Sequence, residues 1–380
     1  MVYLISMIMC CFFYAISKRS TIRLGKVKFK FNIAELLTVI IFTSLTALRS
    51  YSVGTDTINY YFSAENILYK YDSMFSIISS YYIEPGYGIL EYFVMKNFGD
   101  VHYLFMIESI VLFIGLFGFL HYFDKKTPVA MSLFLFLTLY YNTSLNISRQ
   151  FISIGIGLYS IKYLFENNKI RYFLFCIIAS IFHKTGLILF ALYFLKRFFQ
   201  DIDNEVDYYK KILVMLFLVL SFIILLKPIA NLLLNMGLLS LKYYIYIVNT
   251  EMQSSLIFNI ASCTPMLLII MFYHKKLINH DERNKVLIVF YLLGAGITIS
   301  SSFYIVVGRM ALYLISVQII LYPQFLFSIG KNKSQLFKLI IYLLSVVFLV
   351  SYWIYCIYYR NFGGTYPYES EILPLLNFNI

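Results

Sequence analysis

Long apolar runs separated by short polar segments make up most of the 380-residue chain. The runs are roughly 17 to 23 residues long, which is close to the length that a helix needs to cross a bilayer. They lack the alternation of apolar and polar positions that outer-membrane strands show. The pattern therefore predicts an all-α, polytopic integral membrane helical bundle, and we expect about 11–13 transmembrane helices.

The clearest apolar runs predict complete crossings, and other runs are shorter. Residues 86–97 are too few to span a bilayer and indicate a re-entrant or interfacial helix. Residues 172–182 and 186–195 are each about half a span, and we favour two short or broken crossings over one long helix. The complete runs comprise residues 1–17, 33–48, 103–120, 129–145, 212–226, 256–273, 286–304, 309–329 and 336–359, and a further crossing starts at Arg149 and ends inside near residues 162–171.

The polar segments between the runs show no internal repeat and no soluble domain, so residues 1–380 are expected to form a single transmembrane domain. Two long loops, residues 49–85 and 229–254, and the tail of residues 360–380 are predicted to be periplasmic. Composition agrees with a membrane protein, because 61% of the residues are hydrophobic and only 13% are charged.

Basic residues set the predicted orientation. The formal charge of +12 would suggest nucleic acid in a soluble protein, but most of the 31 Lys and Arg residues fall in loops that alternation places inside. The positive-inside rule explains this distribution, so we expect no nucleic-acid partner. The basic cluster between residues 18 and 30 is then cytoplasmic, and the run of residues 33–48 crosses outward.

Cysteine usage points to no disulfide framework. The five cysteines lie in apolar runs, without Cys-x-x-Cys spacing or paired histidines. We therefore expect no zinc site and no cofactor.

Five chemically active residues converge on the outer face in this topology: Arg49, Asp56, Arg149, His183 and Arg309. Guanidinium forks bind a diphosphate or a carboxylate through two hydrogen bonds, and arginine on the side where positive charge is disfavoured is costly to keep. This convergence favours an anionic ligand. The alternative is that each arginine reaches lipid headgroups.

Three residues are candidates for acid and base chemistry. Asp56 follows a Gly-Thr turn and could act as a general base, or it could only cap a helix or form an Asx-turn. Glu84, before Pro85, is a second carboxylate with the alternative of a solvated turn. His183 could be a base or a hydrogen-bond donor to a diphosphate, or it could be structural.

The same motifs resemble those of the EpsG/Wzy-type bacterial polysaccharide polymerases along nearly the whole chain. They are the Arg49, Gly54-Thr55-Asp56 and Tyr60 signature, Glu84-Pro85-Gly86-Tyr87, Ser148-Arg149-Gln150, Phe182-His183-Lys184-Thr185, Gly308-Arg309 with Tyr313, and Tyr366-Pro367-Tyr368.

The resemblance implies a multi-pass glycosyltransferase of the bacterial cytoplasmic (inner) membrane with a GT-C-like architecture. It would join undecaprenyl-diphosphate-linked oligosaccharide repeat units into O-antigen, capsule or exopolysaccharide. Arg49, Arg149 and Arg309 would bind the diphosphate, and Asp56, His183 or Glu84 would be catalytic. Gln150, Tyr60 and Tyr313 would contact the substrate, and a chain-length regulator and a flippase of the same pathway would be partners.

Other membrane functions fit the pattern less well. A flippase or transporter of lipid-linked sugars is the main alternative, and it predicts charges near the midplane and symmetry-related broken helices. A glycoside hydrolase has no use for a diphosphate clamp. A membrane O-acyltransferase would need an intramembrane histidine that serves a cytoplasmic donor, whereas His183 is predicted on the outer side.

Overall fold

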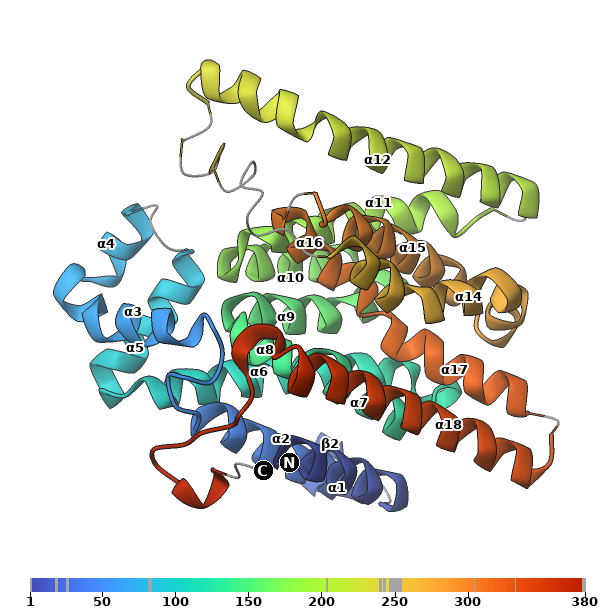
Figure 1. Cartoon of the computed structure of the whole chain (residues 1–380), viewed down its shortest axis with the longest axis horizontal. Helices are drawn as coiled ribbons and strands as arrows, with labels where there is room; N and C mark the ends of the chain where they lie inside the picture. Colours follow the sequence, from blue (N-terminus) through green and yellow to red (C-terminus); the bar gives the residue numbers. More distant parts are fainter. Residues whose placement is uncertain are drawn as a thin grey trace. The chain divides into compact units, whose positions relative to one another are not determined.

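Helices form nearly all of the regular structure of the protein in a computed structural model (Figure 1). It describes residues 2–17, 20–24, 27–80, 84–202, 204–238, 241, 244–245, 255–303, 305–331 and 333–377. The chain divides into two compact units. The first unit comprises Met1–Gly186 and Ile329–Ile380, and the second comprises Leu187–Ser328.

The first unit begins with two helices and a small hairpin between them. α1 (Val2–Ile16) and α2 (Ile33–Ala47) coincide with the first two predicted runs. β1 (Ser20–Leu24) and β2 (Val27–Phe31) pair antiparallel in the segment that we predicted only as a basic loop. In β2 apolar residues alternate with two lysines, which is the period of a strand and explains the hairpin.

The predicted exterior loop of residues 49–85 contains two helices, α3 (Thr57–Lys70) and α4 (Met74–Ser79). It leads into α5 (Pro85–Phe98), which agrees with the short helix predicted for residues 86–97. One face of α3 is buried against α5 and α6, and the spacing of its buried positions is that of a helix. These positions are Thr57, Tyr60, Ala64 and Ile67.

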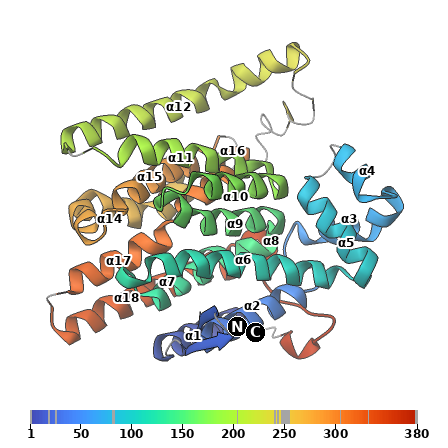
Figure 2. The same cartoon turned by 180° about the vertical axis from the view of Figure 1, so that it is seen from behind.

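Two long helices, α6 (Val101–Phe123) and α9 (Ser148–Phe165), pack against each other in the middle of the first unit. They lie side by side in both views (Figures 1 and 2). A Cβ at Gly115 of α6 would collide with the carbonyl group of Gly155 of α9. Glycine at both positions therefore lets the two backbones approach closely, as small residues do in membrane helix pairs.

A long helical run connects α6 to α9. It consists of α7 (Val129–Phe136), the π-helical η2 (Leu137–Tyr141) and α8 (Asn142–Asn146), and it agrees with the crossing predicted for residues 129–145. The side chain of Asn142 accepts a hydrogen bond of 2.8 Å from Trp353 Nε1. This bond fixes the C-terminal part of the chain to the core of the first unit.

The C-terminal part of the first unit contains α18 (Gln335–Trp353), which continues into the π-helical η4 (Ile354–Tyr359). Two short 3₁₀ turns follow in the tail, η5 (Phe362–Gly364) and η6 (Pro374–Leu376). The tail is therefore an ordered part of this unit that returns to the loop after α2.

The predicted break between residues 182 and 186 is confirmed. α10 (Lys169–Phe182) ends at His183, a 3₁₀ turn η3 (Lys184–Leu187) follows, and α11 (Ile188–Phe199) begins directly after it. Because α9 and α10 are joined by a short turn and pack along their length, they form an antiparallel hairpin.

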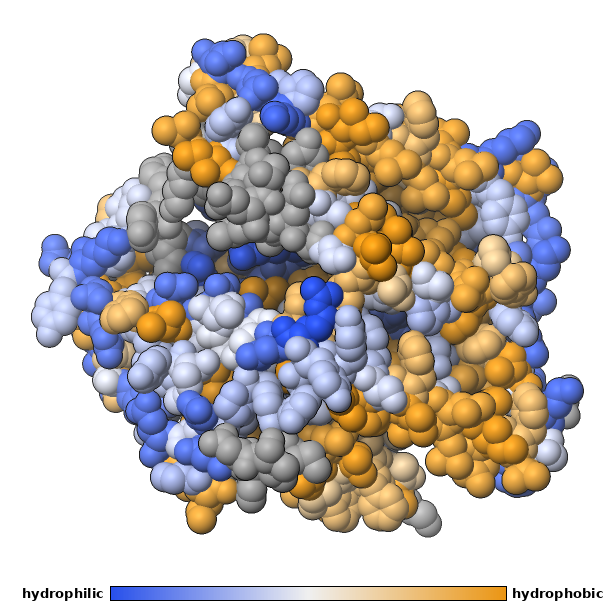
Figure 3. Space-filling view, in the orientation of Figure 1, coloured by the Kyte–Doolittle hydropathy of each residue, from blue (hydrophilic) through white to orange (hydrophobic). Residues whose placement is uncertain are grey.

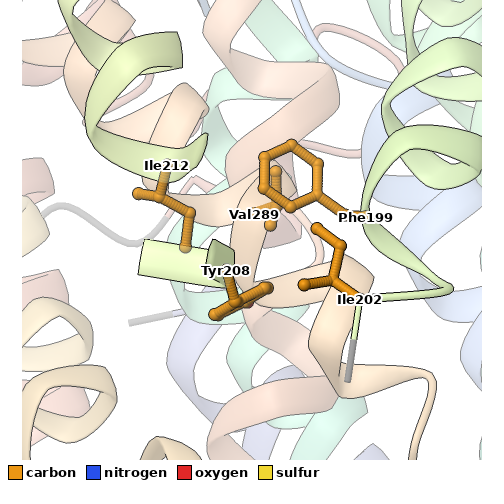
Figure 4. Packing of buried hydrophobic residues seen from close by; sticks show 5 residues of the cluster. All are labelled: Phe199, Ile202, Tyr208, Ile212 and Val289. Atoms are coloured by element: carbon orange, nitrogen blue, oxygen red, sulfur yellow. The ribbon is translucent and has the colours of Figure 1, made fainter. Parts of the chain in front are cut away.

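The second unit is a helical bundle with a core at the end of α11. Its further helices are α12 (Glu205–Asn235), α14 (Leu256–His280), α15 (Asn284–Ser300), α16 (Ile305–Ile315) and α17 (Gln318–Gly330). Figure 4 shows a cluster in which α11, α12 and α15 meet around Phe199, Ile202, Tyr208, Ile212 and Val289. Burial of these side chains joins the three helices.

The second predicted periplasmic loop, residues 229–254, begins later than we expected. α12 continues through Lys227 and Pro228 to Asn235, well beyond the predicted run of residues 212–226. Most of the rest of this loop lies outside the described residues.

Five helical stretches in the described part of the chain are long and apolar enough to cross a membrane. They are Val101–Lys126, Glu205–Asn235, Leu256–His280, Val307–Gly330 and Gln335–Tyr359, and shorter apolar helices accompany them. The prediction of a polytopic helical membrane protein is thus confirmed. The count of 11–13 crossings and the GT-C-like architecture stay predictions.

The surface of the first unit changes character between its parts. In Figure 3 the surface over α3, α4 and α5 is largely hydrophilic, whereas that over α18 is largely hydrophobic. α18 exposes large apolar side chains along its length, including Leu336, Leu339, Leu344 and Val347. The surface of α18 is thus of the kind that lipid covers, and α3 to α5 form the more polar part of this unit. The exterior position of α3 and α4 stays a prediction.

Cysteine labelling can test the orientation. A cysteine at Tyr69, which is 91% exposed on α3, should react with a membrane-impermeant maleimide in intact cells. A cysteine at Asn204, between Lys196 and Arg197 of α11 and Lys210 and Lys211 of α12, should react only after permeabilisation, because positive charge is retained inside. Labelling of Asn204→Cys in intact cells would show that the predicted orientation is inverted.

Candidate functional site

The loop of residues 49–56 joins α2 to α3 and is fastened to the C-terminal tail. The amide of Gly54 donates a hydrogen bond to the Gly364 carbonyl at 2.7 Å, and the amide of Thr55 donates to the Gly363 carbonyl at 2.9 Å. Gly54 has a φ of 101°, a conformation that side chains rarely allow. The positive φ of Gly54 and the two hydrogen bonds to the tail together fix the loop that carries Asp56.

Asp56 is half-buried at the position before α3. Its backbone amide donates to Asn146 Oδ1 at 2.8 Å, and the same oxygen accepts a 2.9 Å hydrogen bond from Thr55 Oγ1. The Asp56 carboxylate makes no capping hydrogen bond to the helix. The backbone at Asp56 is therefore fixed by Asn146, while its carboxylate is not used as a helix cap.

Arg49 lies beneath this loop with a fully buried side chain. Its Nη1 donates to the Thr46 carbonyl at 2.7 Å, its Nη2 donates to Ser148 Oγ at 3.3 Å, and its guanidinium carbon lies 3.8 Å from the centre of the Phe105 ring. Because Ser148 begins α9, Arg49 ties the loop to the helix that carries Arg149. These contacts are those of a positioning residue, and diphosphate binding by Arg49 stays a prediction.

Arg149 lies in the first turn of α9. Its Nη1 is 3.4 Å from Glu84 Oε2, and its guanidinium carbon is 5.5 Å and 5.4 Å from the ring centres of Tyr60 and Tyr87. The arginine side chain is still 37% exposed, whereas that of Glu84 is 16% exposed. Ile147, before the helix, offers no capping side chain, so the first N–H groups of α9 add positive potential. An anionic group can thus reach a guanidinium fork at a helix N-terminus.

His183 lies at the same end of the α9–α10 hairpin as Arg149. Ser153, about one turn into α9, donates from its Oγ to the Ala179 carbonyl at 2.8 Å, and Ala179 is about one turn before His183. His183 Nδ1 is 2.6 Å from Thr185 Oγ1, which orients the imidazole ring.

The start of α5 meets this end of the hairpin too. A Cβ at Gly86 would lie 2.7 Å from Ile181 Cγ2, so α5 begins against the last turn of α10. Glu84 comes two residues before Gly86 and contacts Arg149. The first unit therefore brings Glu84, Arg149 and His183 to one end of the bundle.

Tyr60 connects Asp56 with Arg149. Its hydroxyl interacts electrostatically with both residues, and its side chain is only 5% exposed. Burial raises the pKa of Tyr60 to about 12, so the hydroxyl keeps its proton at neutral pH and can donate a hydrogen bond. Gln150, the other predicted substrate contact in this unit, is 1% exposed and lies beneath the surface.

Arg309 and Tyr313 belong to the second unit and lie on α16. Arg309 is half-buried, and Tyr313 is buried. A Cβ at Gly308 would lie 2.7 Å from Ser301 Cβ, so α16 begins close to the end of α15. Convergence of Arg309 with Arg149 on one site stays a prediction.

Two buried carboxyl groups were not predicted from the sequence. Glu91 of α5 is 0% exposed and Glu108 of α6 is 3% exposed, and among the described residues no donor meets hydrogen-bond geometry at any of their four oxygens. The buried hydroxyl of Tyr87 lies beside them. A lone acidic residue in an apolar run, such as Glu108, was the available signal, because such residues are rare in membrane helices without a function.

The residues that the structure describes include no group of three or more His, Cys, Asp or Glu side chains that could hold a metal ion. The five cysteines are free thiols. Arginine, carboxylate, imidazole and tyrosine side chains, with Lys184 beside His183, are the charged or titratable groups described at this end of the first unit.

Comparison with known proteins identifies one family. A model of the EpsG family matches residues 32–370, a range that includes every candidate residue described above. No curated protein and no solved structure matches the chain.

Proposed function

The chain belongs to the EpsG family of membrane proteins in polysaccharide biosynthesis, and we propose that it joins undecaprenyl-diphosphate-linked oligosaccharide repeat units into a polymer. The polymer would be O-antigen, capsule or exopolysaccharide, made at the outer face of the bacterial cytoplasmic membrane. The observation that carries the proposal is the accessible guanidinium of Arg149 at a helix N-terminus, with aromatic rings and candidate bases beside it.

The donor is bound through its diphosphate. The fork of Arg149 donates two hydrogen bonds to phosphate oxygens, and the N-terminal amides of α9 add to the same field. Negative charge grows on the diphosphate as its bond to the sugar breaks, so a fixed cation stabilises the transition state more than the ground state. Arg309 supplies a second cation if the two units bring it to the same headgroup.

The acceptor is activated by a base. Asp56 takes the proton of the acceptor hydroxyl, and the oxygen attacks the anomeric carbon of the donor sugar. The bond between that carbon and the diphosphate oxygen breaks, and undecaprenyl diphosphate leaves with the electron pair. Direct displacement inverts the anomeric carbon. Asp56 is favoured because its carboxylate is not used as a cap; His183 and Glu84 are the alternatives.

Aromatic side chains surround the proposed diphosphate-binding arginine. The ring centres of Tyr60 and Tyr87 lie 5.5 Å and 5.4 Å from the guanidinium carbon of Arg149, and the two side chains are only 5% and 1% exposed. They therefore position the arginine, and a contact of Tyr60 with substrate would be made through its hydroxyl beside Arg149. Gln150 lies next to Arg149 on α9, and Tyr313 would act from the second unit. A chain-length regulator and a flippase of the same pathway are the proposed protein partners.

The glycan profile of a strain that lacks the protein tests this function. We expect long polymer to disappear while glycans with a single repeat unit persist, because export of units precedes their joining. Loss of single units as well as polymer would instead indicate the flippase alternative. Re-expression of the intact chain is the control and should restore the full ladder.

A further inference from the structure

Glu91 and Glu108 form a buried carboxyl pair in the first unit, between α5 and α6. Both side chains are almost completely buried, and in the part of the chain that the structure describes no donor completes a hydrogen bond to their oxygens. Burying two ionised carboxylates near each other costs free energy unless each has a cation close by. The cations near the two groups differ, and this difference suggests different roles.

Glu108 has a permanent counter-charge. It interacts with Arg49, whose own side chain is fully buried and fixed to the start of α9. The hydroxyl groups of Tyr87 and Ser148 also face this carboxyl. Arg149 also acts on Glu108, but less than Arg49 does. Because no solute reaches Arg49, the charge balance of Glu108 depends mainly on a cation that a ligand cannot occupy.

Glu91 depends on an accessible cation. Arg149 on α9 is its principal opposite charge. The guanidinium carbon of Arg149 lies 5.4 Å from the ring centre of Tyr87, which is one turn before Glu91 on α5. Lys70 and Ser63 face Glu91 from α3, and Glu108 faces it from α6. Of the other elements packed against α5, α4 has no titratable side chain, and the near end of α10 offers His183. Burial raises the pKa of Glu91 to about 7 even with Arg149 present.

The donor diphosphate competes for the charge of Arg149. On the proposed function, which this step requires, the headgroup takes the guanidinium and adds negative charge near Glu91. Both changes disfavour the ionised carboxylate. We propose that Glu91 takes up a proton when a lipid-linked diphosphate binds at Arg149, and that it releases the proton when undecaprenyl diphosphate leaves.

The proton comes from bulk water and forms an O–H bond on the Glu91 carboxylate, so no other reactant is needed. Uptake is measurable only where Glu91 is ionised before binding, that is, at pH values above its pKa in the free protein. Proton uptake on binding makes affinity fall as pH rises in that range, by at most about tenfold per pH unit for one proton.

Calorimetry with the purified full-length protein tests the proposal. The probe is farnesyl-diphospho-N-acetylglucosamine, because a diphosphate diester lacks the phosphate ionisation near pH 6 that a monoester has. Between pH 7 and 8 its Kd should rise about fivefold, because about half of Glu91 is already protonated at pH 7. Titration at pH 8 in two buffers of different ionisation enthalpy should show uptake approaching one proton per bound probe.

Glu91→Gln imitates the protonated carboxyl and should bind the probe with the same Kd at both pH values. At pH 8 its affinity should exceed that of the wild type by about tenfold, a gain that damaged structure would not produce. Glu65→Gln, which removes an exposed carboxylate on α3, should keep the wild-type pH dependence and proton uptake.

The outcomes separate this proposal from the proposed function. A wild type that binds the probe and polymerises but takes up no proton would overturn the role of Glu91 alone. Persistent uptake in Glu91→Gln would place the proton elsewhere, with His183 the first alternative. A wild type with no affinity for any lipid diphosphate would overturn the proposed function and this inference together.

Discussion

Replacing Asp56 with asparagine should slow chain extension by about two to four orders of magnitude, which is the scale of a positioned general base. Asparagine keeps an acceptor oxygen and the preference for this turn, but it cannot take up a proton at neutral pH. The bond from the Asp56 amide to Asn146 involves only the backbone of Asp56 and survives the change. We therefore expect the variant to stay folded in the membrane.

The measurement is the rate of ladder growth from purified lipid-linked units, with protein abundance measured in parallel. Asp72→Asn provides a matched control, because Asp72 is an exposed aspartate in the turn between α3 and α4. It should extend chains at the wild-type rate. Near-normal extension by Asp56→Asn would remove Asp56 from the mechanism and transfer the base role to His183.

Apolar runs predicted the membrane helices well because burial in lipid requires a continuous apolar stretch. The ends of the helices were less predictable. α12 continues past the lysines that we took as its boundaries, from Glu205 to Asn235. Lysine stems can lie along the membrane interface, so a basic residue marks the interface but does not end a helix.

The helices of the exterior segment could have been predicted. The buried residues Thr57, Tyr60, Ala64 and Ile67 recur every three or four positions, which is the amphipathic pattern of α3. Their moderate hydropathy hid the pattern beside the strongly apolar runs. The pairing of the loop with the C-terminal tail had no sequence signal, because it uses backbone groups of Gly54 and Thr55.

The candidate site was also predictable only in part. Motif order singled out Asp56, Glu84, Arg149 and His183, which the first unit brings to one end. The difference between Arg49 and Arg149 was invisible in the sequence, since both follow apolar runs in the predicted topology. Only packing shows that one guanidinium is enclosed and the other accessible.

Replacing Arg149 with lysine should reduce the rate of polymerisation by about two to three orders of magnitude, comparable to the loss of one fixed donor to a developing oxyanion. Lysine keeps the positive charge and its attraction to Glu84, so the local charge balance is preserved. It loses the planar fork, which donates two parallel hydrogen bonds to a diphosphate, and it packs less well beside Tyr60 and Tyr87.

Because the lost bonds strengthen as charge develops on the leaving diphosphate, the defect should fall mainly on kcat and less on KM for the lipid-linked donor. Arg171→Lys is the matched control, since Arg171 is an exposed arginine in the first turn of α10, at the opposite end of the same hairpin. It should leave polymer length and rate unchanged. Full-length polymer from Arg149→Lys at normal abundance would show that a positive charge alone suffices, and interaction with lipid headgroups would then explain this arginine better than a diphosphate fork.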